Sequence, residues 1–186
     1  MDIIRFADLE GSPWINGGGS LKVIAAGTLA QGGGLDIGAG DHWDWRLSIA
    51  DVRQPGLFSG LPGIRRVLTL VDGGPLQLTI DGTSRSVASH QPLSFDGGAV
   101  TTAELPQGPV RNLNLMCRAG RTEGTVTILP LGEHQLMPHQ VAVLLDGHAH
   151  ASGTALRRFD AVLGSKAAPQ VIRGQGTAAL VELNPC

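Results

Sequence analysis

The sequence is poor in charge and in cysteine. Asp, Glu, Lys and Arg make up 16% of its 186 residues, where globular domains usually have about a quarter, and the net charge is −2. A basic stripe is absent, which argues against nucleic acid as a partner. The only cysteines are Cys117 and Cys186, so a disulfide framework is not the source of stability, and a reducing compartment fits.

Long apolar runs are also missing. No segment approaches the roughly 18 apolar residues that span a bilayer. The N-terminus carries acidic Asp2, Asp8 and Glu10 and does not resemble a signal peptide. We therefore expect a cytoplasmic protein without a membrane partner. The helical period of 3.6 residues is absent too, so we expect no helix longer than two turns.

Glycine and proline are abundant instead, with 27 and 11 residues, and 42% of the chain is hydrophobic. This composition is typical of many short strands joined by tight turns. Apolar and polar residues alternate over 45–52, 76–80 and 112–118, and these segments predict strands. Further strands are predicted over 3–6, 22–25, 65–71, 125–129, 140–145 and 178–183. Asp81-Gly82 is a hairpin signal, and the glycine-rich stretch 31–40 is expected to be an exposed turn.

A weak internal repeat relates 68–73 to 143–147, since each is an apolar run that ends in Asp-Gly. The spacing of the two segments fits a duplicated small barrel, although two such units can also arise by chance in a β-rich chain. Small closed barrels protect their edge strands without helices.

Five segments, taken in order and spacing, resemble the HutD/Ves family. They are 13–19 (Pro-Trp-Ile-Asn-Gly-Gly-Gly), 45–52 with its continuation 56–66, 70–74, 95–97 and 114–118. The resemblance covers about the first two-thirds of the chain. It implies an all-β fold of the cupin-like double β-barrel type (a bicupin, with RmlC-like jelly rolls). We expect a first cupin lobe over 1–122 and a second, smaller lobe over 123–186.

The resemblance also implies a bacterial protein linked to histidine utilisation or stress response, with no established catalytic activity. Its pocket would hold a small carboxylate, formate-like or a formylated product of histidine breakdown. The chain departs from the family at three points. Ile15 replaces a basic residue, the run around Lys22 replaces Thr-Arg-Glu, and Asn112 replaces Asp. Lys carries a point charge and cannot form the two parallel hydrogen bonds of an Arg, so the ligand, or the way in which it is bound, can differ from that of the family.

A candidate site follows from the alternation. Arg46 and Ser48 share one face of their strand, and Asn114 and Met116 share one face of theirs. If both faces point inward, they form a polar lining whose guanidinium can hold a carboxylate through two parallel hydrogen bonds. The candidate ligand-binding residues are Trp14, Asn16, Arg46, Ser48, Arg66, Asn114 and Met116.

Each candidate also has a structural interpretation. Arg46 could pair with Asp44 or Asp51 as a surface or structural arginine. The same interpretation is stronger for Arg118, which ends its strand. Trp14 and Met116 could be core residues, and Asn114 a buried amide with its hydrogen bonds satisfied.

Metal is the main competing idea, because many cupins bind it through two His one residue apart, then a Glu and a distant His. Only His148-Ala149-His150 has that local form, and the next Glu is Glu182. The pair also follows Asp146-Gly147, expected to be a turn, so we expect it to be exposed. We predict no metal and no cofactor. A serine or cysteine nucleophile would need a positioned base, and none falls in the family segments, so no catalytic residue is predicted.

The leading hypothesis is a binding protein that holds a small anionic metabolite and modulates histidine utilisation. One alternative is a metal-independent enzyme acting on a formylated or ureido acid of histidine breakdown. Another is an interaction module with a vestigial pocket. A homodimer is compatible with all three.

Overall fold

The computed structural model describes residues 3–14, 17–38 and 42–186. Nearly all regular structure in this part is β-strand, and the one helical element is a single 3-10 turn, η1 (Phe6–Asp8). The all-β class expected from the sequence is confirmed. No helix in these ranges is long and apolar enough to cross a membrane.

Seven strands form what we call the N-terminal sheet. Their order is β10 (Pro92–Asp96), β7 (Ile64–Asp72), β12 (Val110–Arg118), β5 (Trp45–Val52), β3 (Gly19–Ala30) and β2 (Gly11–Pro13), with β4 (Gly34–Ile37) on β3. The strands predicted over 45–52, 65–71 and 112–118 are confirmed. The exposed turn expected over 31–40 is wrong in part. Leu35 packs against a cluster of buried residues that includes Trp45 and Leu47, and β4 pairs with β3.

Four strands form the small sheet, in the order β6 (Gly56–Leu57), β11 (Thr101–Glu104), β8 (Leu76–Ile80) and β9 (Thr83–Val87). The predicted hairpin is confirmed between β8 and β9, where Asp81 and Gly82 have φ of 46° and 78°. Two positive φ values are what the tight hairpin turn requires. The small sheet packs on one face of the N-terminal sheet through a cluster of buried residues that includes Leu68, Leu70, Leu76, Leu78, Phe95, Ala103 and Val110.

The remaining strands form the C-terminal sheet. Its order is β1 (Ile3–Ile4), β17 (Ala161–Leu163), β15 (Gln140–Ala151), β18 (Gln170–Pro185) and β13 (Thr122–Pro130), with β14 (Glu133–Leu136) on β18 and β16 (Thr154–Leu156) on β15. The turn expected at Asp146-Gly147 is wrong. Gly147 has φ of 93°, and the register with β18 shifts here, but the pairing continues to Ala151. A glycine at positive φ bends the strand without reversing it.

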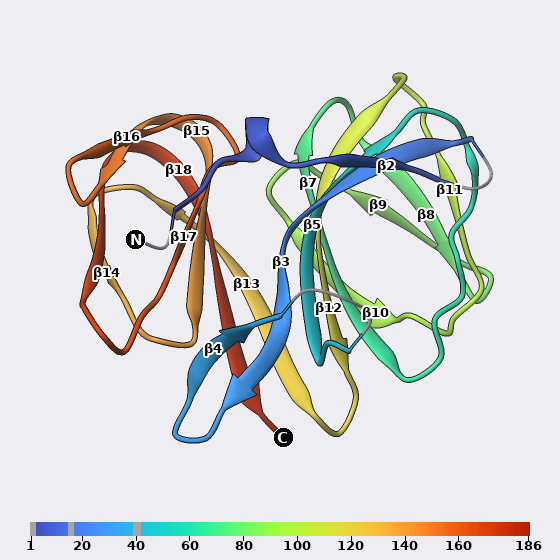
Figure 1. Ribbon diagram of the computed structural model, residues 1–186. Coiled ribbons are helices and arrows are strands. Elements are labelled where there is room, and N and C mark those ends of the chain that lie inside the picture. Colours follow the sequence, from blue (N-terminus) through green and yellow to red (C-terminus); the bar gives the residue numbers. More distant parts are fainter. Residues whose placement is uncertain (1–2, 15–16, 39–41) are drawn as a thin grey trace.

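The two large sheets pack against each other around a central core. Alternate residues of β5 and β12 pack there with residues of β15 and β18: Trp45, Leu47, Ile49, Leu113, Leu115, Cys117, Val141, Val143, Leu145, Val181 and Leu183. Figure 1 shows two groups of strands side by side, with β3 and β13 running between them. Side chains alternate across a strand, so the intervening residues of β5 and β12 face away from this core.

The division into lobes over 1–122 and 123–186 stays a prediction, and strand pairing departs from it at the N-terminus. Ile3 and Ile4 pair with β17 of the C-terminal sheet. Asp160 then binds the next two residues, with Oδ2 2.5 Å from Arg5 Nη1 and Oδ1 2.9 Å from Phe6 N. The first described strand, β1, therefore belongs to the C-terminal sheet, and the second, β2, belongs to the N-terminal sheet.

Candidate ligand-binding cavity

The main cavity lies on the face of the N-terminal sheet that points away from the central core. Its volume is about 460 Å³, within the range of small-molecule sites. It is lined by Pro13, Trp14, Leu21, Arg46, Ser48, Ala50, Leu57, Phe58, Ser59, Leu61, Arg66, Asn112, Asn114 and Met116. The structure thus brings together Trp14, Arg46, Ser48, Arg66, Asn114 and Met116, which are all the predicted binding residues except one. The exception, Asn16, lies outside the described residues.

Cross-strand register places the polar residues in rows. Arg46 of β5 and Arg66 of β7 both lie opposite Met116 of β12. In the next row, Ser48 lies opposite Asn114. Residues that oppose each other on neighbouring strands point to the same face. The two guanidinium groups therefore approach the cavity from either side of β12.

Arg46 is half-buried and makes no ion pair with the described residues. Its Nη2 lies 3.3 Å from the sulfur of Met116, and its guanidinium carbon lies 5.0 Å from the centroid of the Trp43 ring. Its Nε is buried without a hydrogen-bond partner. Burial lowers the pKa of Arg46 because the charged form loses solvation.

The acids that could have paired with Arg46 are engaged elsewhere. Asp44 lies 3.7 Å from Arg118, and Asp51 lies 2.5 Å from Arg111. Arg118 itself is exposed and does not line the cavity. The structural interpretation of Arg46, an ion pair with either neighbouring acid, is therefore wrong, whereas it holds for Arg118.

Arg66 is more deeply buried, with 5% of its surface exposed. Its Nη2 donates to the carbonyl oxygen of Ser59 at 3.2 Å, and its guanidinium carbon lies 5.9 Å from the centroid of the Phe58 ring. Its Nε has no partner. Burial, and then repulsion from the charge of Arg46, lowers the pKa of Arg66 to about 10. Arg66 is thus a second cation that has no acidic partner among the residues that the structure describes.

The amide of Asn114 adds an unsatisfied acceptor to the lining. Its Oδ1 is buried and accepts no hydrogen bond from the described part of the chain. Its backbone carbonyl lies 3.5 Å from the hydroxyl of Ser48. A buried polar atom without a partner is unfavourable by about 1–3 kcal/mol. Asn114 is therefore not the fully satisfied core amide that the sequence left open, and a ligand polar group would complete it.

Two aromatic residues, Trp14 and Phe58, line the cavity. The rings of Trp14 and Phe58 meet edge to face, with centroids 6.3 Å apart. The backbone N–H of Trp14 donates to the carbonyl of Gly19 at 2.9 Å, which anchors the indole beside β3. Lys22, which the resemblance predicts to replace an Arg, does not line the cavity. Its Nζ donates to the carbonyl of Phe6 at 3.2 Å.

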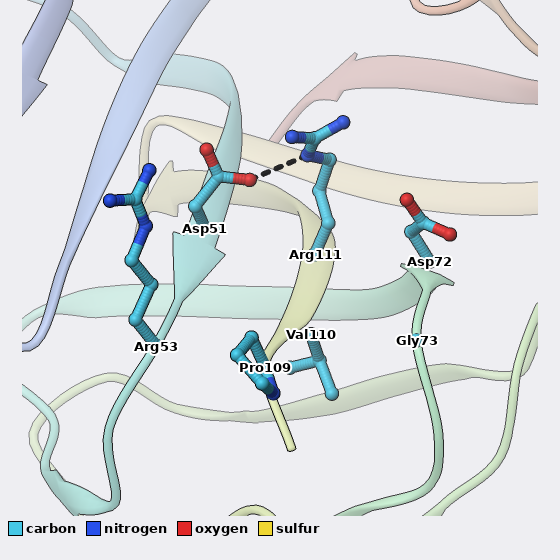
Figure 2. A pocket seen from close by; sticks show the side chains of 7 residues that line it. All are labelled: Asp51, Arg53, Asp72, Gly73, Pro109, Val110 and Arg111. Atoms are coloured by element: carbon cyan, nitrogen blue, oxygen red, sulfur yellow. Dashed lines mark hydrogen bonds and ion pairs between the residues drawn. The ribbon is translucent and has the colours of Figure 1, made fainter. Parts of the chain in front are cut away.

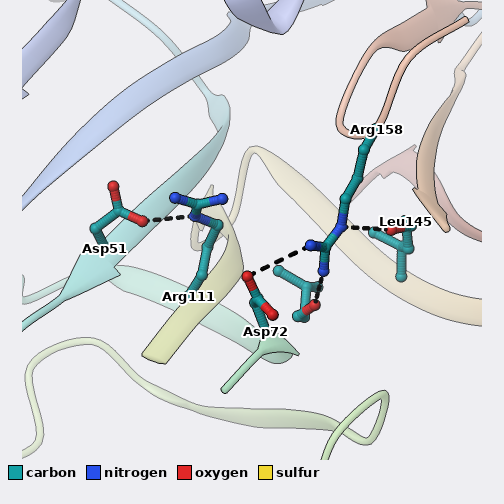
Figure 3. Close-up of polar contacts among 6 residues, drawn as sticks. Asp51, Asp72, Arg111, Leu145 and Arg158 are labelled. Carbon is teal, nitrogen blue, oxygen red and sulfur yellow. Dashed lines mark hydrogen bonds and ion pairs between the residues drawn. The ribbon is translucent and has the colours of Figure 1, made fainter. Parts of the chain in front are cut away.

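A second cavity, of about 370 Å³, lies at the ends of β5 and β7 and the start of β12 (Figure 2). Two ion pairs join the acids around it to arginines: Asp51 to Arg111 at 2.5 Å, and Asp72 to Arg158 at 3.4 Å (Figure 3). Arg158 also donates to the carbonyl of Leu145 at 2.9 Å (Figure 3). It donates to the carbonyl of Val71 at 2.9 Å as well. The hydrogen bonds of Arg158 to these two carbonyls join the N-terminal and C-terminal sheets, so Arg158 has a structural role.

The described residues offer little for metal or covalent chemistry. Among them, no group of three or more His, Cys, Asp or Glu could hold a metal ion. His148 and His150 are both exposed. Cys117 faces the central core, and burial, with smaller contributions from Cys186 and Glu123, raises the pKa of its thiol to about 12. No His, Asp or Glu is among the described residues that line the main cavity, so Ser48 has no base beside it.

Several lining residues were missed in the sequence. Ala50 and Asn112 alternate in phase with Arg46 and Asn114, so the same pattern could have found them. Phe58 lies in the family segment 56–66 but outside regular alternation. Its place in the lining depends on how the segment after β6 packs against β11, where the backbone N–H of Phe58 donates to the carbonyl of Thr101 at 2.8 Å.

Comparisons with known proteins agree with this architecture. The HutD family model matches residues 6–181. An uncharacterized 21.2 kDa protein in the hutC 3′ region of Pseudomonas putida is 36% identical over 117 residues, or 62% of this chain and 57% of that protein. Protein Ves of Citrobacter koseri is 32% identical over 130 residues, or 67% of this chain and 63% of that protein. Both matches span less than two thirds of the relative's length.

Solved structures match over almost the whole chain. HutD from Pseudomonas fluorescens SBW25, in a formate condition, is 27% identical with a TM-score of 0.80, and the match covers 99% of this chain and 98% of that one. A cupin 2 conserved barrel domain protein from Leptotrichia buccalis, 11% identical with a TM-score of 0.57, covers 100% and 96% and supports the fold alone. The predicted resemblance is confirmed: the chain has a cupin-like all-β fold and belongs to the HutD/Ves family.

Proposed function

We propose that this protein binds a small carboxylate-bearing metabolite in the main cavity and thereby modulates histidine utilisation. The observation that carries the proposal is the pair Arg46 and Arg66, which line the cavity without an acidic residue in its described lining. A buried cation without a counter-charge is unfavourable. A carboxylate would supply the charge and accept two parallel hydrogen bonds from a guanidinium.

Arg46 is the principal carboxylate-binding residue in this proposal. Ser48, Arg66 and Asn114 support it from the neighbouring strands, and Trp14 and Met116 wall the cavity. Asn16 remains a predicted ligand-binding residue, and it lies outside the described residues.

The relatives support the proposal in two ways. One lies in a hutC 3′ region, and the solved HutD structure was obtained in a formate condition, formate being the smallest carboxylate. We further propose that the fold is a bicupin, since separate buried clusters lie on the outer faces of the N-terminal and C-terminal sheets. In that arrangement only the first lobe binds ligand.

The test is a thermal-shift screen of small carboxylic acids, followed by calorimetry on those that stabilise the protein. Arg46→Ala should abolish the ligand-induced stabilisation. Arg65→Ala is the matched control, because Arg65 is exposed, lies on β7 and does not line the cavity. Arg46 makes no ion pair with described residues, so the variant should fold normally.

Retained binding in Arg46→Ala would reject the role of Arg46. An equal loss in Arg65→Ala would indicate a general surface-charge effect and not a site. If no acid in the screen stabilises the unmodified protein, the cavity does not function as a carboxylate site.

A further inference from the structure

The main cavity carries two positive charges and, in its described lining, no negative one. Arg46 and Arg66 both line it, and neither makes an ion pair with the described residues. One bound monocarboxylate would neutralise one of these charges and leave the other uncompensated. The cavity therefore has one more positive charge than a monocarboxylate such as formate can neutralise.

The two cations are held at separate places. Arg46 and Arg66 lie on either side of β12, opposite the same residue, Met116. Adjacent strands are spaced by about 4.8 Å, so their Cα atoms are roughly 10 Å apart. The sulfur of Met116 contacts the guanidinium of Arg46 at 3.3 Å, and the carbonyl of Ser59 holds that of Arg66 at 3.2 Å. Two separated negative charges match this arrangement better than one concentrated charge.

The cavity also has room and a polar group between the cations. Its volume is about 460 Å³. Asn114 lies on β12, one row from Met116, with its Oδ1 buried and unpartnered. A ligand that bridges the two arginines would pass this amide, and a hydroxyl or N–H on its connecting chain could donate to it.

Resting on the proposed function, we infer that the ligand is a dicarboxylate that bridges the cavity, with one carboxylate held by each guanidinium group. Arg46 and Arg66 together then set specificity for two negative charges. Asn114 selects a hydrogen-bonding substituent between them.

The experiment compares diacids with their own half-esters by calorimetry at about pH 7. Succinate and glutarate each carry two carboxylates, and their monomethyl esters keep the carbon chain but lose one charge. A charge-assisted hydrogen bond contributes enough that each diacid should bind about tenfold or more tightly than its half-ester. Binding should occur with one diacid per protein. L-malate should bind more tightly than succinate because its hydroxyl can donate to Asn114.

Variants locate the second carboxylate. Arg66→Gln should reduce the affinity for the diacid to that for the half-ester. Arg65→Ala, outside the cavity lining, should leave the affinities for both ligands unchanged. Arg66 is buried, so the comparison of diacid with half-ester on the unmodified protein stands by itself if the variant does not fold.

Three outcomes would overturn the inference while the proposed function survives. The first is equal affinity for diacid and half-ester. The second is two acetate or formate ions bound per protein with no advantage for a diacid. The third is inorganic phosphate bound more tightly than any diacid, because one concentrated charge would then satisfy both arginines. If no carboxylate binds at all, the proposed function itself fails.

Discussion

Replacing Asp160 by Ala should destabilise the protein far more than replacing an exposed aspartate. Asp160 is buried, with 1% of its surface exposed. Its carboxylate accepts hydrogen bonds from the Arg5 side chain at 2.5 Å and from the backbone N–H groups of Phe6 and Arg157, both at 2.9 Å. These contacts fix the start of the chain to the C-terminal sheet. The truncation would leave both N–H groups and the guanidinium without this acceptor.

The expected loss follows from these contacts. Loss of a hydrogen bond to a charged group lowers the free energy of unfolding by about 1.5–3 kcal/mol, and each buried donor left unsatisfied lowers it further. Arg5 is partly exposed and keeps its bond to the carbonyl of Ala155, at 2.7 Å, which limits its share. We expect about 3 kcal/mol in total, or a fall in Tm of roughly 6–12 °C for a chain of this length.

The measurement is urea unfolding followed by tryptophan fluorescence, with Tm from calorimetry. Asp72→Ala is the matched control, because Asp72 is exposed and its 3.4 Å ion pair with Arg158 is a surface contact. Such pairs contribute about 0–1 kcal/mol. The loss of stability in Asp160→Asn should lie between the losses in Asp160→Ala and Asp72→Ala, because the single amide oxygen can accept only some of the hydrogen bonds that the carboxylate accepts. The reasoning is refuted if Asp160→Ala loses no more stability than Asp72→Ala.

Other predictions concern thiol reactivity, acid stability and a glycine whose backbone conformation other residues rarely adopt. At about pH 8, maleimide should label exposed Cys186 but not Cys117, whose pKa is held at about 12 chiefly by burial, and both should react after denaturation; equal native rates would contradict this. Hydrogen bonds from neighbouring side-chain amides lower the pKa of Glu182. The stability that they contribute is present at neutral pH and is lost as the pH falls through that lowered pKa. Glu182→Gln should therefore show less loss in urea midpoint between about pH 7 and pH 3, and identical profiles would count against it. Gly147→Ala should destabilise by about 2 kcal/mol, because φ is 93° and the new Cβ would lie 2.1 Å from a backbone oxygen. Gly132→Ala, in open space, is its control in the same unfolding assay, and equal losses would contradict the strain.

Local alternation made much of the N-terminal sheet predictable. In β5 and β12 a side chain's face is decided by its position along its own strand. Arg46 and Asn114 could therefore be assigned to one polar face without knowing their neighbours. The strand at 34–37 was missed because glycine-rich segments carry little alternation, and only its pairing with β3 defines it. Gly147 was misread because Asp-Gly favours a turn, whereas the long partner strand β18 holds it extended.

The ion-pair partners and the loop residues of the site depend on tertiary contacts, which the local sequence pattern does not predict. Alternation suggested Arg46 as a cavity residue but could not say whether Asp44 or Asp51 would neutralise it. The register of β5 with β12 puts Arg111 opposite Asp51, and the pair that results removes one candidate partner. The segment that brings Phe58 into the lining is likewise determined by tertiary packing. Cross-strand register and loop placement are non-local, so they had to come from the structure.

A comparison of the two cavities supports the proposal that the arginines of the main cavity bind an anionic ligand. Around the second cavity, Arg111 and Arg158 each have an aspartate, so their charges are compensated within the protein. In the main cavity neither Arg46 nor Arg66 has one among the described residues, and the pKa of Arg66 falls to about 10. Burial and the neighbouring charge of Arg46 thus disfavour the charged form of Arg66. The anion of the proposed function would neutralise both groups and raise both pKa values, so part of its binding free energy would come from relieving this unfavourable burial of charge.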